Sequence, residues 1–189
     1  EEKQLNELAN GIDEMETEIK KVDGVPIPAG FVYVGGTKAS GLVISDAAAD
    51  NEKYKGQTTV GTDLQGNQFV WIPVDSIADY KRTAYSTEVA SGTTDTATNS
   101  EQIKYSSSSS NYFKEALPAD EKTSVETNKG FYIGRYELSN EGVQKGKDTL
   151  SNVNWYVLYN KCMELNASDK VKSRMVWGLQ WDLACDFIS

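Results

Sequence analysis

The residues of this 189-residue chain that could do chemistry are two cysteines, scattered carboxylates and many hydroxyls, because the chain contains no histidine. Histidine is the commonest general base and a frequent metal ligand. A serine or cysteine nucleophile would therefore lack its usual activating imidazole, and no Gly-x-Ser-x-Gly motif is present. The sequence predicts a protein that is not an enzyme, with no catalytic residue, no metal site and no cofactor.

The two cysteines, Cys162 and Cys185, stand at a spacing that fits no zinc or redox motif. One interpretation is that both are small buried hydrophobic side chains. The other is a single disulfide between two neighbouring helices. The sequence leaves both interpretations open.

Two acidic stretches, "DAAADNE" (46–52) and "DTATNSE" (95–101), offer alternating oxygen ligands. Neither has the glycine and the closing glutamate of an EF-hand loop, so solvated loops are the simpler interpretation. Trp71 and Tyr132 could stack on sugar rings, but their surroundings favour packing in a core. The net charge of -9 disfavours a nucleic acid or an anionic membrane surface as partner.

Several elements must hold these side chains in place. Short runs rich in β-branched and aromatic residues predict strands within 31–36, 41–46, 67–74 and 129–139. A short helix is expected before Pro118, which would end it. A helix over 151–166 and a last helix within 173–189 complete the pattern, and the first of these should bury a stripe made of Trp155, Leu158, Tyr159, Cys162 and Leu165.

The N-terminal residues 1–23 predict an amphipathic helix, because their apolar residues recur at alternating spacings of three and four. This stripe either lies on the chain's own domain or forms a seam with another subunit. It consists of Leu5, Leu8, Ile12, Met15, Ile19 and Val22. Residues 24–189 would form one domain, interrupted at 83–111 by a Ser/Thr-rich insertion whose composition predicts a mobile surface loop.

Three segments, "FYIGRYELSN" (131–140), "SNVNWYVLYNKCMELN" (151–166) and "SRMVWGLQWDLACDFI" (173–188), resemble in order and spacing the formylglycine-generating enzyme, or sulfatase-modifying-factor, family. The resemblance implies a variant of the C-type-lectin fold, and Arg174 and Trp181 stand in family-like places. Residues 25–75 resemble a bacterial branch in which such a domain follows a type IV pilin-like helix. The family's calcium ligands and copper-binding cysteine pair belong to a later half, so we expect this chain to match the front part of the domain.

The sequence therefore predicts an α+β fold: an N-terminal amphipathic helix, then a partial lectin-like domain with a small, mainly antiparallel sheet and two flanking helices. The expected function is that of a non-enzymatic, extracellular subunit of a bacterial cell surface, pilus or filament. It would display a lectin-like head for adhesion to a glycan or protein ligand or for assembly, and would be joined to a membrane only through a segment before residue 1. The alternatives are an oxidase of the formylglycine-generating type whose catalytic half lies elsewhere, and a secreted sugar- or protein-binding module.

The last helix bears on the expected partners, which are other copies of the chain or a neighbouring surface subunit. Its apolar residues Trp181, Phe187 and Ile188 have no evident cover in the sequence. Exposed apolar patches of this kind usually mark an interface. We therefore expect either a neighbouring subunit or a further part of the same domain to cover them, together with the stripe of residues 5–22.

Overall fold

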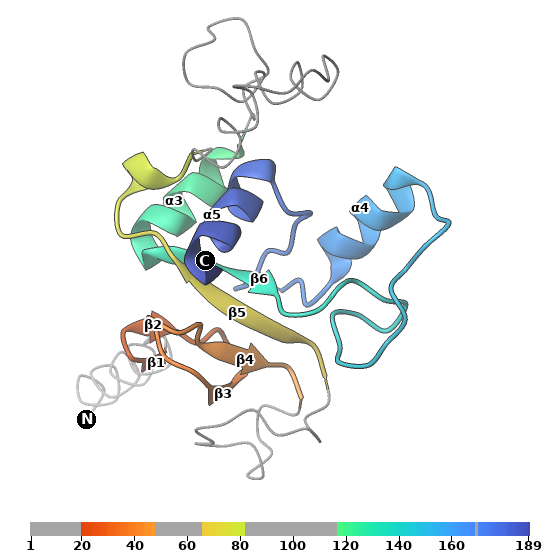
Figure 1. The fold of residues 1–189 in the computed structure, drawn as a ribbon, viewed down its shortest axis with the longest axis horizontal. Helices are drawn as coiled ribbons and strands as arrows, with labels where there is room; N and C mark the ends of the chain where they lie inside the picture. The colour runs from red at the N-terminus through yellow and green to blue at the C-terminus, as the bar shows by residue number, and fades with distance from the viewer. Residues whose placement is uncertain (1–19, 48–65, 82–116, 169) are drawn as a thin grey trace, which may run out of the picture.

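The structure is a computed structural model, and it describes residues 20–47, 66–81, 117–168 and 170–189. Its centre is a four-stranded antiparallel sheet in the order β3-β4-β5-β6, so each strand lies beside its predecessor in the chain (Figure 1). The strands are β3 (Val32–Gly35), β4 (Val43–Ser45), β5 (Gln68–Pro73) and β6 (Gly130–Gly134). All four predicted strand segments are confirmed, and so is the α+β class.

The two faces of the sheet pack against different layers. On one face Leu42, Ile44 and Trp71 form a buried cluster with residues just before β3. On the other face Val74 and Phe131 pack against helices. This alternation follows from the period of two along a strand, which sends Phe131 and Tyr132 to opposite sides.

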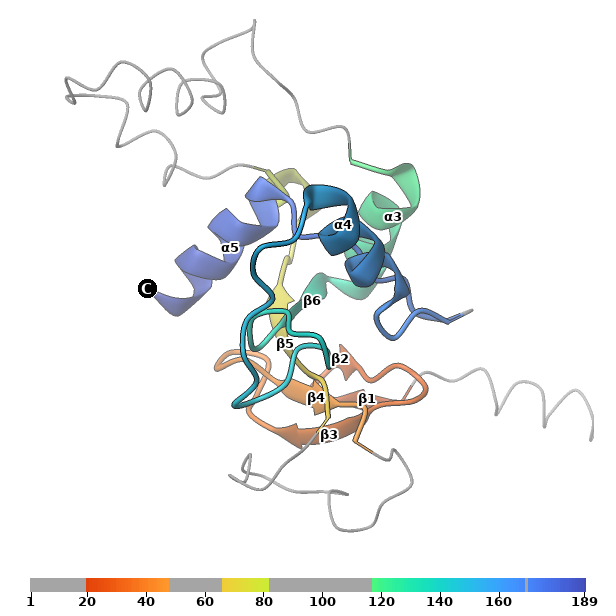
Figure 2. The ribbon, with the colours of Figure 1, turned by 90° about the vertical axis from the view of Figure 1, so that its right-hand side faces the viewer.

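Three helices lie on one side of the sheet: α3 (Ala119–Asn128), α4 (Trp155–Glu164) and α5 (Gly178–Ile188) (Figure 2). A short 3₁₀ turn, η1 (Ile77–Asp79), follows β5 and precedes Tyr80. Val125 of α3 and Leu179 of α5 are both buried in one cluster with Val74 and Tyr80. None of the described helices is long and apolar enough to cross a membrane.

The end of the predicted N-terminal helix is a β-hairpin instead. Strand β1 (Lys21–Val22) pairs with β2 (Val25–Pro26), and the two residues between them, Asp23 and Gly24, have φ of 52° and 76°. Asp-Gly favours this two-residue hairpin turn, which ends a helical pattern before it. Val22 therefore packs against the cluster around Val25, and its assignment to a helical seam is wrong. The other seam residues, Leu5, Leu8, Ile12, Met15 and Ile19, lie outside the described residues.

Pro118 stands at the start of a helix. It occupies the N-cap of α3, and Glu121 and Lys122 donate backbone N–H bonds to its carbonyl. Proline suits the start of a helix because the first residues need no N–H partner within it. The sequence did not predict this helix after Pro118, and the short helix expected before Pro118 falls mainly on residues 111–116, which lie outside the described residues. The Ser/Thr-rich insertion at 83–111 lies outside the described residues, and its mobility stays a prediction.

Candidate interaction face on helices α4 and α5

Helix α4 is confirmed within the predicted range 151–166, but it spans Trp155–Glu164 and so begins later than the predicted Ser/Asn cap at 151–152. The Asn154 side chain caps its start by accepting the Val157 N–H at 3.0 Å, and Asn166, just past its end, has a left-handed φ of 53°. The predicted burial of its stripe is wrong, because no residue of α4 is buried. Leu158, Cys162 and Leu165 are half-buried, whereas Trp155 is 55% and Tyr156 73% exposed.

The exposed rings of α4 contact one another. Trp155 stacks on Tyr159, with ring centroids 4.9 Å apart and planes 21° apart, and Tyr156 meets the edge of Trp155 at 5.3 Å. Rings packed in this way lose little further freedom when a partner covers them. Aromatic side chains are also the residues most enriched in the buried centres of protein interfaces.

Helix α5 divides its apolar residues between the core and the surface. Leu179 is 3% exposed and Leu183 packs beside it, whereas Trp181 is 56% and Ile188 80% exposed. Phe187 is half-buried near the β3–β4 connection, where a Cβ added at Gly41 would lie 3.6 Å from its ring. Of the residues predicted as an interface on this helix, Trp181 and Ile188 are therefore exposed to solvent, and Phe187 is partly buried.

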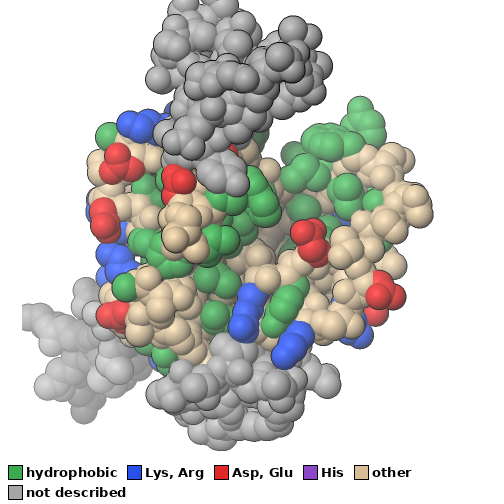
Figure 3. Space-filling model, viewed as in Figure 1, with side chains coloured by type: hydrophobic (Ala, Val, Ile, Leu, Met, Phe, Trp, Pro, Cys, Tyr) green, Lys and Arg blue, Asp and Glu red, His purple; other side chains and the backbone are tan. Residues whose placement is uncertain are grey.

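The described part of the chain presents these residues on two helices that flank β6 (Figure 1). Figure 3 shows hydrophobic side chains gathered over both helices, with the surface hollowed between them. We call this region the α4–α5 face and define it by its exposed residues: Trp155, Tyr156, Tyr159, Trp181 and Ile188.

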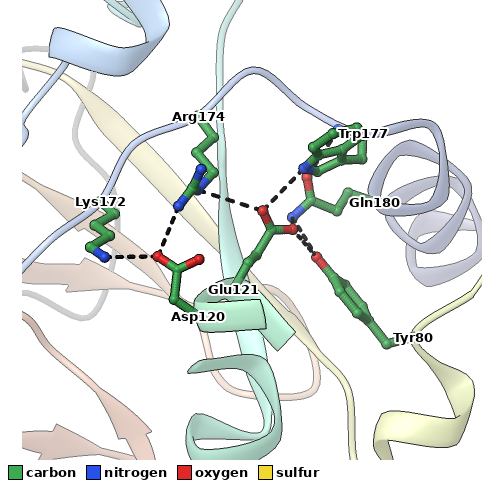
Figure 4. A network of polar contacts seen from close by, with 7 residues as sticks. All are labelled: Tyr80, Asp120, Glu121, Lys172, Arg174, Trp177 and Gln180. Atoms are coloured by element: carbon green, nitrogen blue, oxygen red, sulfur yellow. Dashed lines mark hydrogen bonds and ion pairs between the residues drawn. The ribbon is translucent and has the colours of Figure 1, made fainter. Parts of the chain in front are cut away.

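The start of α5 is held to α3 by a polar network centred on Glu121 (Figure 4). One carboxylate oxygen of Glu121 accepts the Tyr80 hydroxyl at 2.6 Å and the Gln180 amide at 3.2 Å. The other oxygen accepts the Trp177 indole N–H at 3.0 Å. The Glu121 side chain is only 10% exposed, so these donors replace most of its water.

Two cations extend this network over the surface of α3. Lys172 and Arg174 both donate to one oxygen of Asp120, at 2.7 Å and 2.9 Å, and the Arg174 guanidinium also lies 3.7 Å from Glu121. The hydrogen bond from Lys172 is the main cause that lowers the pKa of Asp120, and the Arg174 charge acts in the same direction. Every acid of the network has cationic or N–H and O–H partners, so the arrangement is a clamp between helices.

A second polar cluster ties α4 to the sheet. The Asp46 carboxylate accepts the Asn67 backbone N–H at 2.7 Å, the Asn67 amide at 2.7 Å and the Asn166 amide at 2.8 Å. The Asn67 side-chain oxygen in turn accepts the Val143 N–H. Asp46 is the only acid of the 46–52 stretch that the structure describes, and its oxygens bind amides. The described residues contain no group of three possible metal ligands.

The remaining candidates lie apart from the α4–α5 face or within its helices. Cys162 and Cys185 are free and half-buried, so the alternative of a disulfide between them is wrong, and burial raises the pKa of Cys162. Trp71 is 2% exposed and packs edge-on against Tyr132 at 4.9 Å. The Tyr132 hydroxyl donates to the Pro26 carbonyl, and burial raises its pKa. Core packing of both rings, rather than sugar stacking, is therefore confirmed.

Sequence reasoning missed Glu121 altogether. Its partners Tyr80, Trp177 and Gln180 are about 40 to 60 residues away in the chain. No local sequence pattern predicts hydrogen bonds between residues so far apart in the chain. The only signal was a glutamate in the first turn of a helix after a proline, which is common on any surface.

No protein-family model, no curated protein and no solved structure matches this chain.

Proposed function

We propose that this chain is a non-enzymatic subunit of an extracellular bacterial assembly, such as a pilus or surface filament. In this proposal its lectin-like head docks on a neighbouring subunit through the α4–α5 face. The observation that carries the proposal is the contiguous set of exposed rings on α4, namely Trp155, Tyr156 and Tyr159.

The free energy of exposing these rings supports a partner. Burying one large apolar side chain contributes roughly 1.5–3 kcal/mol. The α4–α5 face exposes five such side chains to water. The free energy that their burial would contribute is a sizeable fraction of the stability of an ordinary domain. A neighbouring polypeptide that covers them recovers this free energy.

The polar clusters support a structural role for the rest of the surface. Tyr80, Trp177 and Gln180 donate hydrogen bonds to Glu121. Lys172 and Arg174 donate to Asp120. These contacts leave neither carboxylate poised as a general base. The first cluster instead holds α5 to α3, and the second holds the end of α4 to the residues next to β4 and β5, which fixes the orientation of the docking face.

Sedimentation velocity of the whole chain tests this function. At tens of micromolar we expect wild-type protein to form dimers or larger species, and the double variant Trp155→Ser/Tyr159→Ser to remain monomeric. Asn160→Ala is the matched control, because Asn160 is exposed on the same helix but is not part of the apolar set. Wild-type protein that stays monomeric at every concentration, or a double variant that associates as wild type does, would contradict the proposal.

A sugar-binding module is the second candidate, because the stacked Trp155–Tyr159 pair also presents a flat apolar ring to solvent. Titration calorimetry with neutral oligosaccharides distinguishes the two. Saturable binding that Trp155→Ser abolishes, without any self-association of the wild type, would favour the sugar.

A further inference from the structure

We infer that the free edge of β6 accepts an extended strand from the neighbouring subunit, by main-chain hydrogen bonding. This inference rests on the proposed function, since it states how the neighbour engages the region between α4 and α5. It concerns a different surface from the aromatic rings, so the two can be tested separately.

The sheet order leaves β6 with one partner. β6 is the last strand in the order β3-β4-β5-β6 and pairs only with β5 among the described strands. Two backbone bonds set the phase of this pairing: the Val74 N–H donates to the Lys129 carbonyl and the Arg135 N–H to the Gln68 carbonyl, each at 2.9 Å. Antiparallel pairs alternate between bonded and non-bonded, so residues 131 and 133 also bond to β5.

The residues between them turn their backbone groups outward. By the same alternation, the N–H and C=O of Tyr132 and Gly134 point away from β5, towards the free edge. Within the described residues, no backbone or side-chain group bonds to the main chain of either residue. Both residues are half-buried, and a partly desolvated backbone group without a partner is costly.

The opposite edge of the sheet differs in regularity. The β3–β4 pairing shifts register between Tyr33 and Gly35, and such a bulge hinders the approach of another strand. The β5–β6 pairing runs through five residue pairs without a shift. Strand β6 also carries no proline and no lysine or other charged residue. Such residues are the usual means of protecting the edge of a sheet.

The chemistry of this edge defines its occupant. Only another extended polypeptide supplies donors and acceptors at the alternating spacing that residues 130–134 present. In Figure 1 β6 lies between α5 and α4, and the exposed rings of the α4–α5 face stand on these two helices. A strand with apolar residues at alternate positions therefore matches both the backbone edge and its surroundings.

Gly134→Pro tests the edge with little change elsewhere. Proline removes the outward N–H of residue 134, while Gly134 opposes Phe69 as a non-bonded pair, so no β5–β6 hydrogen bond is lost. Gly134→Ala is the matched control. Both substitutions add a Cβ that would lie 3.1 Å from the Val143 side chain, but alanine keeps the N–H.

The probe is a fluorescein-labelled synthetic peptide with the sequence of residues 67–74, flanked by lysines for solubility. In anisotropy titrations we expect saturable binding to wild type and to Gly134→Ala, and binding weaker by about tenfold or more for Gly134→Pro. Hydrogen exchange should show that the peptide protects the amides of Tyr132 and Gly134. Trp155→Ser/Tyr159→Ser should still bind the peptide through the main chain.

Three results would overturn strand addition: no saturable binding, equal affinity of the proline and alanine variants, or unchanged exchange at Tyr132 and Gly134. If any of these results occurs while the sedimentation experiment still shows ring-dependent assembly, strand addition is rejected and the proposed function is retained. If the peptide binds as expected but the chain does not assemble, the β6 edge accepts a strand, and the proposal that copies of the chain dock through the α4–α5 face is rejected.

Discussion

Helices α4 and α5 are similar in length and composition, yet only one of them is packed. Each carries tryptophan and leucine residues at helical spacing. Leu179 and Leu183 of α5 pack against Val74 and Phe131 of the sheet, and Trp177 and Gln180 bind Glu121. Helix α4 buries none of its residues. The period of apolar residues thus identifies the apolar side of a helix, but not what covers it.

The difference arises from how each helix is attached. Helix α5 is held at its first turn by a desolvated carboxylate and lies along the sheet, with contacts to β5. Helix α4 is attached mainly at its C-terminal end, through Asn166 and Asp46. An element anchored at one end leaves its apolar side free for another surface.

The largest expected effect comes from removing a packed leucine. Leu179→Ala should lower the free energy of unfolding by about 2–4 kcal/mol, because it leaves a cavity in the cluster with Val74 and Tyr80. The equivalent change on α4, Leu158→Ala, should cost less than about 1 kcal/mol, because its surroundings are already half-open. Urea denaturation followed by circular dichroism measures both. Equal losses would mean that α4 is as well packed as α5.

The next effect concerns the clamp that α5 has and α4 lacks. Glu121→Ala should cost about 1–3 kcal/mol, because the Trp177, Tyr80 and Gln180 donors lose their common acceptor in a half-buried site. Glu126→Ala, an exposed acid on the same helix, is the control and should change stability little. A loss no larger than that of the control would show that the network adds nothing to the attachment of α5.

A smaller effect should appear only with pH. The pKa of Asp120 is lowered by the hydrogen bond from Lys172. A carboxyl with a lowered folded-state pKa stabilises the fold above its unfolded pKa, about pH 4, and loses this contribution as the pH falls through the folded value. Asp120→Asn should therefore be less stable than wild type near pH 7, and the difference should shrink on acidification below pH about 4. A difference that is constant with pH would contradict the assignment.

The smallest effect should come from the exposed rings themselves. Trp155→Ser should change the free energy of unfolding of the monomer by no more than about 0.5 kcal/mol, since the ring has mainly Tyr156 and Tyr159 as neighbours. Denaturation at low protein concentration measures this, and Trp181→Ser on α5 gives a parallel case. A large loss from Trp155→Ser alone would show that α4 is part of the core.

Local patterns predicted most of the elements. β-branched and aromatic runs identified all four strands of the sheet, and the spacing of apolar residues identified α4, although its N-cap is Asn154 and not the predicted Ser/Asn pair at 151–152. The Asp23–Gly24 pair was a recognisable hairpin signal that the helical interpretation of residues 1–23 passed over. Helix α3 was not predicted, although a proline is common at the start of a helix and Pro118 stands at its N-cap.

The candidate face could be predicted only in part. The apolar character of Trp181 and Ile188 was evident in the sequence, and both are exposed. The exposure of Trp155 and Tyr159 was not, because burial depends on residues far away in the chain. The free edge of β6 likewise follows from strand order, which is a property of the whole sheet and not of the segment 130–134.

The places of the four tryptophans give the molecule an optical signature. Trp71 is sealed in the core and the Trp177 indole donates to Glu121, whereas Trp155 and Trp181 are more than half exposed. A neutral collisional quencher such as acrylamide should therefore reach two emitters readily and the other two poorly, which gives a curved quenching plot. The accessible pair sits wholly on the α4–α5 face, so any molecule that covers this face should straighten the plot and shift the emission to the blue without a label being attached.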